Sequence, residues 1–142
     1  MEMIPRLTLA DARIMMAAAE NEARRIGVDM DIAITDDGGN LLMFHRMDHA
    51  RITSIDIAIN KSFTAAAARK STRAYGEISG PGGPTFGIHT SNQGRFAIIA
   101  GGLPICVEDR VAGGIGCSSG SPDQDEAVAQ AGIDALLESL KK

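Results

Sequence analysis

The sequence predicts an α+β domain built on a five-stranded antiparallel sheet with helices on its faces. Apolar residues recur at helical spacing over residues 9–25 and again over residues 53–73. Residues 30–35 alternate apolar and polar side chains and run into Asp-Asp-Gly-Gly-Asn, a turn sequence typical of a β-hairpin that returns along residues 41–44. Residues 96–117 hold three further apolar runs separated by short turns, which indicates a three-stranded meander.

Capping signals mark two of the expected helices. Thr8 and Asp11 have the spacing of a capping box at the start of the first helix, and Gly27 ends that helix. Ser121 and Gln124 repeat the capping-box spacing, with a proline at the first helical position between them. The last helix is therefore expected to begin near residue 122.

The middle of the chain joins a helix to a long loop. Ile55, Ile59 and Phe63 form an i, i+4 apolar stripe. The N-cap expected for this helix is Thr53 or Ser54. Residues 79–94 contain five glycines and two prolines, too many for a regular element, and ordered loops of this length are often functional. No linker or repeat interrupts the chain, so residues 1–142 are expected to form a single domain.

Composition narrows the partners and the compartment. The net charge of −4 comes without a basic block, which argues against a nucleic-acid partner. No apolar run approaches the ~20 residues that a membrane span needs, so no membrane association is expected. The first six residues lack the charged start and the apolar stretch of a signal peptide. These features predict a cytoplasmic protein.

The glycine-rich stretch before the last helix offers backbone N–H groups to an anion. Gly116 to Gly120 lies next to a helix N-terminus, where Ser118 and Ser119 are expected to hold a carboxylate. The spacing of a phosphate-binding loop is missing, and the acidic residues that follow would repel a polyphosphate. Cys117 shares a strand face with Ile115 and is therefore expected to be buried and unreactive.

A cluster of polar residues lies between the second strand and the middle helix: Arg46, Asp48, His49, Ser54 and Lys61. One interpretation is structural, with an ion pair between Arg46 and Asp48 or between Asp56 and Lys61. The other is an anion-binding pocket that includes the long loop, where Arg46 or Lys61 binds a carboxylate. In that pocket His49 or His89 would move a proton.

The same histidines are poorly placed for a metal ion. His45 and His49 are four residues apart at the end of a strand, which separates them by about 13 Å in an extended chain. One ion cannot bridge that distance, so we expect no metal site.

Four segments together resemble the GlcG/HbpS family, which also occurs as the C-terminal domain of PduO proteins. They are ITDDGGNLL, RMDHARITSIDIAINKSFTA, AGGLPICVEDRVAGGIGCSSG and DQDEAVAQAG, in that order. The resemblance covers residues 7–137. It implies a profilin-like or roadblock-like α-β-α domain, assembly into homo-oligomers, commonly octamers, and in several members binding of haem or a related tetrapyrrole. A haem here would take its ligand from His45, His49, His89, a methionine or a cysteine, or would have no protein ligand.

The preferred hypothesis is a cytoplasmic, oligomeric protein that binds a small, anionic molecule, with haem as the expected cofactor. The second hypothesis is an enzyme that acts on a small unsaturated mono- or dicarboxylic acid from aromatic catabolism, by tautomerisation, elimination or hydrolysis. In that enzyme His49 acts as acid or base, and Arg46 or Lys61 holds the carboxylates with the amides of Ser118 and Ser119. A third hypothesis is a non-catalytic subunit that mainly drives assembly.

Overall fold

The structure is a computed structural model that describes all residues 1–142, with four α-helices and one four-stranded antiparallel sheet. The strand order is β2-β1-β4-β3. The strands are β1 (Asp31–Asp36), β2 (Leu41–Arg46), β3 (Gly102–Val107) and β4 (Arg110–Ser118). The helices are α1 (Leu9–Ile26), α2 (Thr53–Ala68), α3 (Thr72–Ile78) and α4 (Pro122–Leu140). Two short 3₁₀ turns, η1 (Ile88–Thr90) and η2 (Asn92–Gly94), lie in the long loop.

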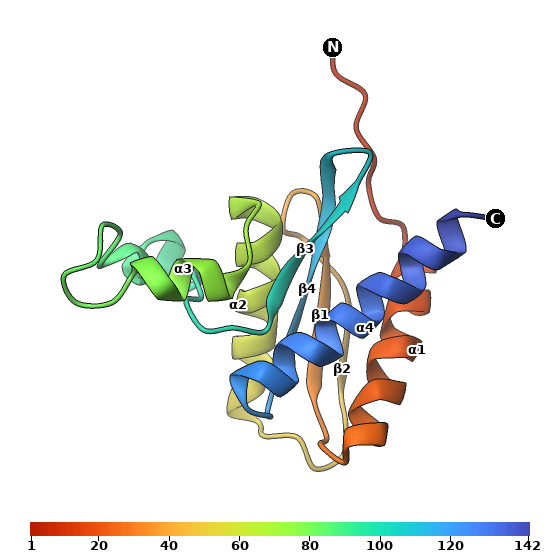
Figure 1. Cartoon of the computed structure of the whole chain (residues 1–142), viewed down its shortest axis with the longest axis horizontal. Coiled ribbons are helices and arrows are strands. Elements are labelled where there is room, and N and C mark those ends of the chain that lie inside the picture. Colours follow the sequence, from red (N-terminus) through yellow and green to blue (C-terminus); the bar gives the residue numbers. More distant parts are fainter.

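The helices form two layers around the sheet (Figure 1). α1 and α4 pack against each other on one face, and α2 lies on the opposite face. Aliphatic side chains and methionines fill the core between the sheet and the α1–α4 layer, among them Met15, Met16, Ile32, Ile34, Ile105, Ile115, Val128 and Leu136. α3 and the loop after it project away from this body on the side of α2 (Figure 1).

The face of the sheet under α2 is built from glycine in place of large side chains. Along β4, Ile115 and Cys117 belong to the core under α1 and α4, so the alternating Gly114 and Gly116 face α2. A Cβ atom at Gly116 would lie 2.2 Å from the carbonyl oxygen of Ala58 in α2. The backbone of α2 therefore rests directly on β4.

The expected fifth strand, residues 96–100, is not a strand. The backbone N–H of Ala97 donates to the hydroxyl of Thr64 at 2.8 Å. The ring of Phe96 packs edge-on against Tyr75, with 4.8 Å between ring centroids. These contacts hold the segment against α2 and α3. The prediction of five strands is wrong, because this segment packs against helices at its start instead of pairing with a strand.

The helix expected over residues 53–73 ends early, and a second, short helix that was not predicted follows it. α2 ends at Ala68, and Arg69 takes a left-handed backbone conformation with φ of 58°. Ser71 then caps α3 by accepting a hydrogen bond from the backbone N–H of Ala74. The apolar stripe lies entirely within α2, so it predicted that helix but neither the break nor α3.

The capping predictions hold for the first and last helices. Capping boxes form between Thr8 and Asp11 and between Ser121 and Gln124. The prediction for α2 is wrong, because its N-cap is Ile52 and no side chain caps it. No helix is both long enough and apolar enough to span a membrane.

Candidate functional site

A polar pocket lies at the β2 edge of the sheet, between β2 and α1. Its volume is about 430 Å³, which falls within the range of small-molecule sites. We call it the α1–β2 pocket, and it is lined by Glu20, Arg24, Asp29, Phe44, His45, Arg46, Met47 and Asp48. A histidine, two arginines and three carboxylates therefore share one cavity.

His45 is held in this pocket by a side chain of α1. In the sheet His45 pairs with Ile32, whose side chain belongs to the core under α1, so the imidazole lies on the α1 side. Its Nδ1 contacts the carboxylate of Glu20, which also accepts a hydrogen bond from Arg24 at 3.1 Å. The other ring nitrogen, Nε2, makes no hydrogen bond within the chain and is left for a ligand.

The charges that line the α1–β2 pocket are mixed, because an unpaired carboxylate, Asp48, shares the cavity with the two arginines. Arg24 already neutralises Glu20, and the Asp29 carboxylate accepts the backbone N–H of His49 at 2.8 Å. Arg46 forms no salt bridge, although it pairs with Asp31 across the sheet and acts to lower the pKa of that carboxyl, so its guanidinium keeps hydrogen-bond donors for an anion from outside. The pocket thus combines a free imidazole nitrogen with an unpaired cation.

The polar cluster predicted from the sequence is separated by the structure. Arg46 and Asp48 line the α1–β2 pocket. Ser54 is buried and accepts a hydrogen bond from Ser118 at 3.0 Å, which joins α2 to the end of β4. His49 is exposed, and its imidazole lines none of the cavities.

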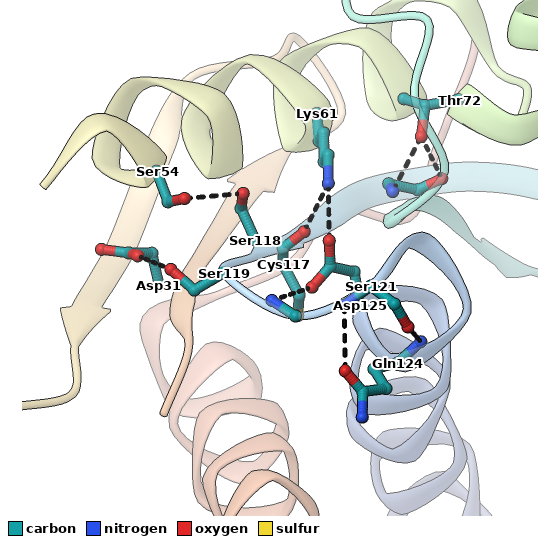
Figure 2. Close-up of polar contacts among 12 residues, drawn as sticks. Asp31, Ser54, Lys61, Thr72, Cys117, Ser118, Ser119, Ser121, Gln124 and Asp125 are labelled. Atoms are coloured by element: carbon teal, nitrogen blue, oxygen red, sulfur yellow. Dashed lines mark hydrogen bonds and ion pairs between the residues drawn. The ribbon is translucent and has the colours of Figure 1, made fainter. Parts of the chain in front are cut away.

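Lys61 lies at a buried junction between α2, β4 and α4 (Figure 2). Its ammonium donates to the carbonyl oxygen of Cys117 at 2.9 Å and to the carboxylate of Asp125 at 3.0 Å. The ion pairs expected between Asp56 and Lys61 and between Arg46 and Asp48 do not form. The lysine instead pairs with a residue from the first turn of α4.

The glycine-rich loop does hold carboxylates, but they belong to the chain itself. The backbone N–H of Gly120 donates to Asp125 at 2.9 Å. The hydroxyl of Ser119 donates to Asp31 at 2.8 Å (Figure 2). It also accepts the backbone N–H of Arg51 at 3.0 Å. Sequence reasoning missed both aspartates, because nothing local to either residue indicates that tertiary structure will bury it.

Cys117 is buried, as predicted from the strand period. Burial raises the pKa of its thiol, and the neighbouring Asp125 carboxylate raises it further, against the smaller effect of Lys61. A thiol in this environment stays protonated at neutral pH and is a poor nucleophile. Its role is to fill the core beneath α1 and α4.

A second cavity, with a volume of about 260 Å³, lies between α2 and residues 89–99, which connect the long loop to β3. We call it the arm pocket, and it is lined by Ile57, Asn60, Lys61, His89, Gly94, Phe96, Ala97, Ile98 and Ile99. Lys61 and His89, two of the residues predicted from the sequence, therefore share a cavity. Arg46 and Asp48 lie in the α1–β2 pocket instead.

The fold is that of a small α-β-α protein, and the α1–β2 pocket places a histidine and two arginines at one edge of its sheet. Residues 7–134 match the family described as haem-degrading protein HbpS-like. The chain belongs to this family, which confirms the resemblance drawn from the four sequence segments.

Relatives match along almost the whole chain. A 15.0 kDa protein from the dhaT–dhaS intergenic region of Citrobacter freundii is 37% identical over 137 residues, which cover 96% of each chain. The crystal structure of Klebsiella pneumoniae ORFY is 35% identical, with a TM-score of 0.94 over 96% of this chain and 94% of that one. A crystal structure of a PduOC–haem complex is 29% identical, with a TM-score of 0.88 over 92% of this chain and 94% of that one.

Proposed function

We propose that this protein binds haem, or a related tetrapyrrole, at the α1–β2 pocket, with His45 as the iron ligand. The observation that carries the proposal is the free Nε2 of His45, which Glu20 holds in a pocket that two arginines help to line. Membership of a family described as haem-degrading supports it, as does the haem bound in the PduOC complex.

The residues of the pocket suit this cofactor. A carboxylate on the second ring nitrogen fixes the tautomer and orientation of a metal-binding histidine and makes it a stronger ligand, and Glu20 occupies that place. Arg24 and Arg46 would bind the propionates, and Phe44 and Met47 offer apolar contact to the macrocycle. Bound haem supplies an iron centre whose redox chemistry belongs to the cofactor.

A single copy of the chain covers only part of a macrocycle, so we also propose a homo-oligomer, an octamer as in the resemblance, that closes the site. Two large apolar side chains outside both pockets support assembly, because they are strongly exposed in one chain: Ile52 at 72% and Phe86 at 61%. Light scattering on the eluting protein measures the assembly directly. We place it in the cytoplasm, in line with its composition.

Haem titration followed by absorbance tests the ligand assignment. The wild type is expected to give the shifted Soret band of histidine-ligated haem, and His45→Ala to lose it. Glu20→Gln should weaken binding by about 10–100-fold, because it removes the outer partner of the ligand. His49→Ala and His89→Ala are the matched controls and should bind as the wild type does. Unchanged binding by His45→Ala would show that the iron ligand lies elsewhere.

The geometry favours haem binding over the alternative of an acid–base enzyme that uses His49 with Arg46 or Lys61. Lys61 is almost fully buried and bound to Asp125, and His49 lines neither pocket. That enzyme would need its acid–base group and its cation in one cavity. An assembly subunit without a ligand, the third hypothesis, predicts no saturable haem binding in the same titration.

A further inference from the structure

We propose that the arm pocket binds a small monocarboxylate with an apolar body, at a site separate from that proposed for haem. The two sites share no residue, because the α1–β2 pocket lies at the β2 edge and the arm pocket lies outside α2. The proposal for the arm pocket is therefore independent of the proposed haem site.

The wall of the arm pocket is mainly apolar. Ile57 comes from α2, and Phe96, Ile98 and Ile99 come from the segment that failed to form a strand. No aspartate or glutamate lines the cavity. At ~30 Å³ for each water molecule, a volume of about 260 Å³ corresponds to roughly nine waters, which sizes the guest as one compact ring or a short chain.

Four hydrogen-bond donors of the residues that line this pocket have no partner in the chain. The imidazole of His89 and the side-chain amide of Asn60 make no hydrogen bond within the chain. The backbone N–H groups of Ile98 and Ile99 also have no acceptor, since the segment pairs with no strand. A carboxylate oxygen accepts several such bonds at once, and the apolar remainder of the same molecule would cover Ile57.

The charge of the pocket limits the guest to one carboxylate. Lys61 lines the cavity, but its ammonium is already bound to Asp125 and to a backbone carbonyl. No free lysine or arginine side chain lines the wall to neutralise a second negative charge. A phosphate dianion or a dicarboxylate would therefore be desolvated without compensation, whereas a single carboxylate is served by neutral donors.

The wall is fixed before any ligand arrives. The hydroxyl of Thr64 accepts the backbone N–H of Ala97 and lies 3.2 Å from the carbonyl oxygen of Arg95, to which it can donate. The guanidinium of Arg95 stacks over Phe63, 4.0 Å from the ring centroid. These contacts tie the returning segment to α2, so binding does not have to order it.

Benzoate is the probe that tests the proposal, with benzyl alcohol as its neutral counterpart. In the full-length protein without haem, isoleucine δ1-methyl NMR should show saturable shifts at Ile57, Ile98 and Ile99 on addition of benzoate. The core methyls of Ile105 and Ile115 should stay unchanged. Benzyl alcohol should bind at least about tenfold more weakly, because it lacks the charge that strengthens each hydrogen bond.

Two variants separate the carboxylate contact from the cavity itself. His89→Ala, at an exposed position, should weaken benzoate at least about tenfold while the thermal midpoint of unfolding stays the same. Ala97→Leu fills the cavity and should abolish binding. His45→Ala, which tests the haem site, should bind benzoate normally, so the failure of one proposal is distinct from failure of the other. Shifts confined to other isoleucines, or full affinity in both His89→Ala and Ala97→Leu, would overturn the proposal.

Discussion

Asp31 is the most unusual side chain of the sheet. It is fully buried at the start of β1, and one carboxylate oxygen, Oδ1, has no hydrogen-bond partner. The other oxygen accepts the hydroxyl of Ser119. Burial raises the pKa of Asp31, against the smaller opposing effects of Ser119, Arg46 and Arg51. A buried charge with half of its lone pairs unused opposes folding whenever the group is ionised.

Replacement of Asp31 by asparagine tests this assignment through pH. Because the pKa of Asp31 is raised on folding, the folded state binds the proton more tightly, and its contribution to stability is present at low pH. That contribution is lost as pH rises from the ordinary value of 3.8 through the raised pKa. Asp31→Asn should therefore cost more stability near about pH 4 than near about pH 7, where it relieves the buried charge.

Urea unfolding at the two pH values measures the difference. Asp125 is also buried with a raised pKa, but it is present in both proteins and cancels in the comparison. An equal cost at both pH values would mean that Asp31 titrates as it does in the unfolded chain.

At the residue scale, the sequence indicated types of side chain better than it indicated their partners. It singled out Lys61 and the loop from Gly116 to Gly120 as places where charge meets hydrogen-bond donors. The actual partner of Lys61 is Asp125 from α4, and the loop residue Ser119 binds Asp31 from β1. Pairing over such distances in the sequence leaves no local signal. The spacing between His45 and His49 argued against a shared metal ion. It could not show that His45 contacts Glu20, because that residue belongs to α1.

At the scale of the elements, α2 packs closely on β4 because the residues of the strand that face the helix are glycines. Gly114 and Gly116 face α2, and the small residues Ala58 and Ser62 face them. The Gly-x-Gly pattern of the strand is therefore a packing surface that brings two backbones together. From the sequence, Gly116 is interpreted as the start of an anion-binding loop that runs to Gly120, whereas in the structure it packs against α2.

Gly116→Ala should lower the free energy of unfolding by about 1–3 kcal/mol, the usual cost of overpacking a rigid site. The added Cβ would meet the carbonyl oxygen of Ala58 at 2.2 Å, and backbone atoms cannot rotate away. Gly80→Ala is the matched control, since a Cβ there meets nothing within 4 Å, and it should leave urea unfolding almost unchanged. A Gly116→Ala protein as stable as the control would mean that α2 is free to move off the sheet.

The elements themselves were predictable wherever a local signal was strong. The hairpin of β1 and β2 and the capping boxes of α1 and α4 all follow from short sequence patterns. Residues 96–100 misled because their apolar composition does not reveal which surface they cover. Their actual partners, Thr64 and Tyr75, lie far away in the sequence. The break after Ala68 likewise depends on a left-handed residue that is not glycine.

On the scale of the whole molecule, the Lys61–Asp125 pair joins the two helical layers. Lys61 belongs to α2 on one face of the sheet, and Asp125 belongs to the first turn of α4 on the other. They meet beyond the end of β4, where the Cys117 carbonyl also accepts from the lysine (Figure 2). Gly101 leaves room for the ammonium, because a Cβ there would lie 2.7 Å from Nζ.

We expect each half of this buried pair to be costly to remove alone. Lys61→Met leaves the Asp125 carboxylate buried without its cation, and Asp125→Asn leaves the ammonium uncompensated, so each should lose about 3–5 kcal/mol. The double variant Lys61→Met/Asp125→Asn should lose clearly less than the sum, with a coupling of about 1–3 kcal/mol, because no unpaired charge remains inside. Urea unfolding of the wild type, the two single variants and the double variant measures this coupling as a double-mutant cycle.

The contrast with a surface pair isolates the effect of burial. Lys141 and Glu138 form an exposed ion pair at the end of α4, and Lys141→Ala should leave the unfolding midpoint almost unchanged. Strict additivity of the Lys61 and Asp125 variants would mean that each acts through its own surroundings. Strong coupling would instead establish that one ion pair at the end of β4 fixes α2 and α4 to the same sheet.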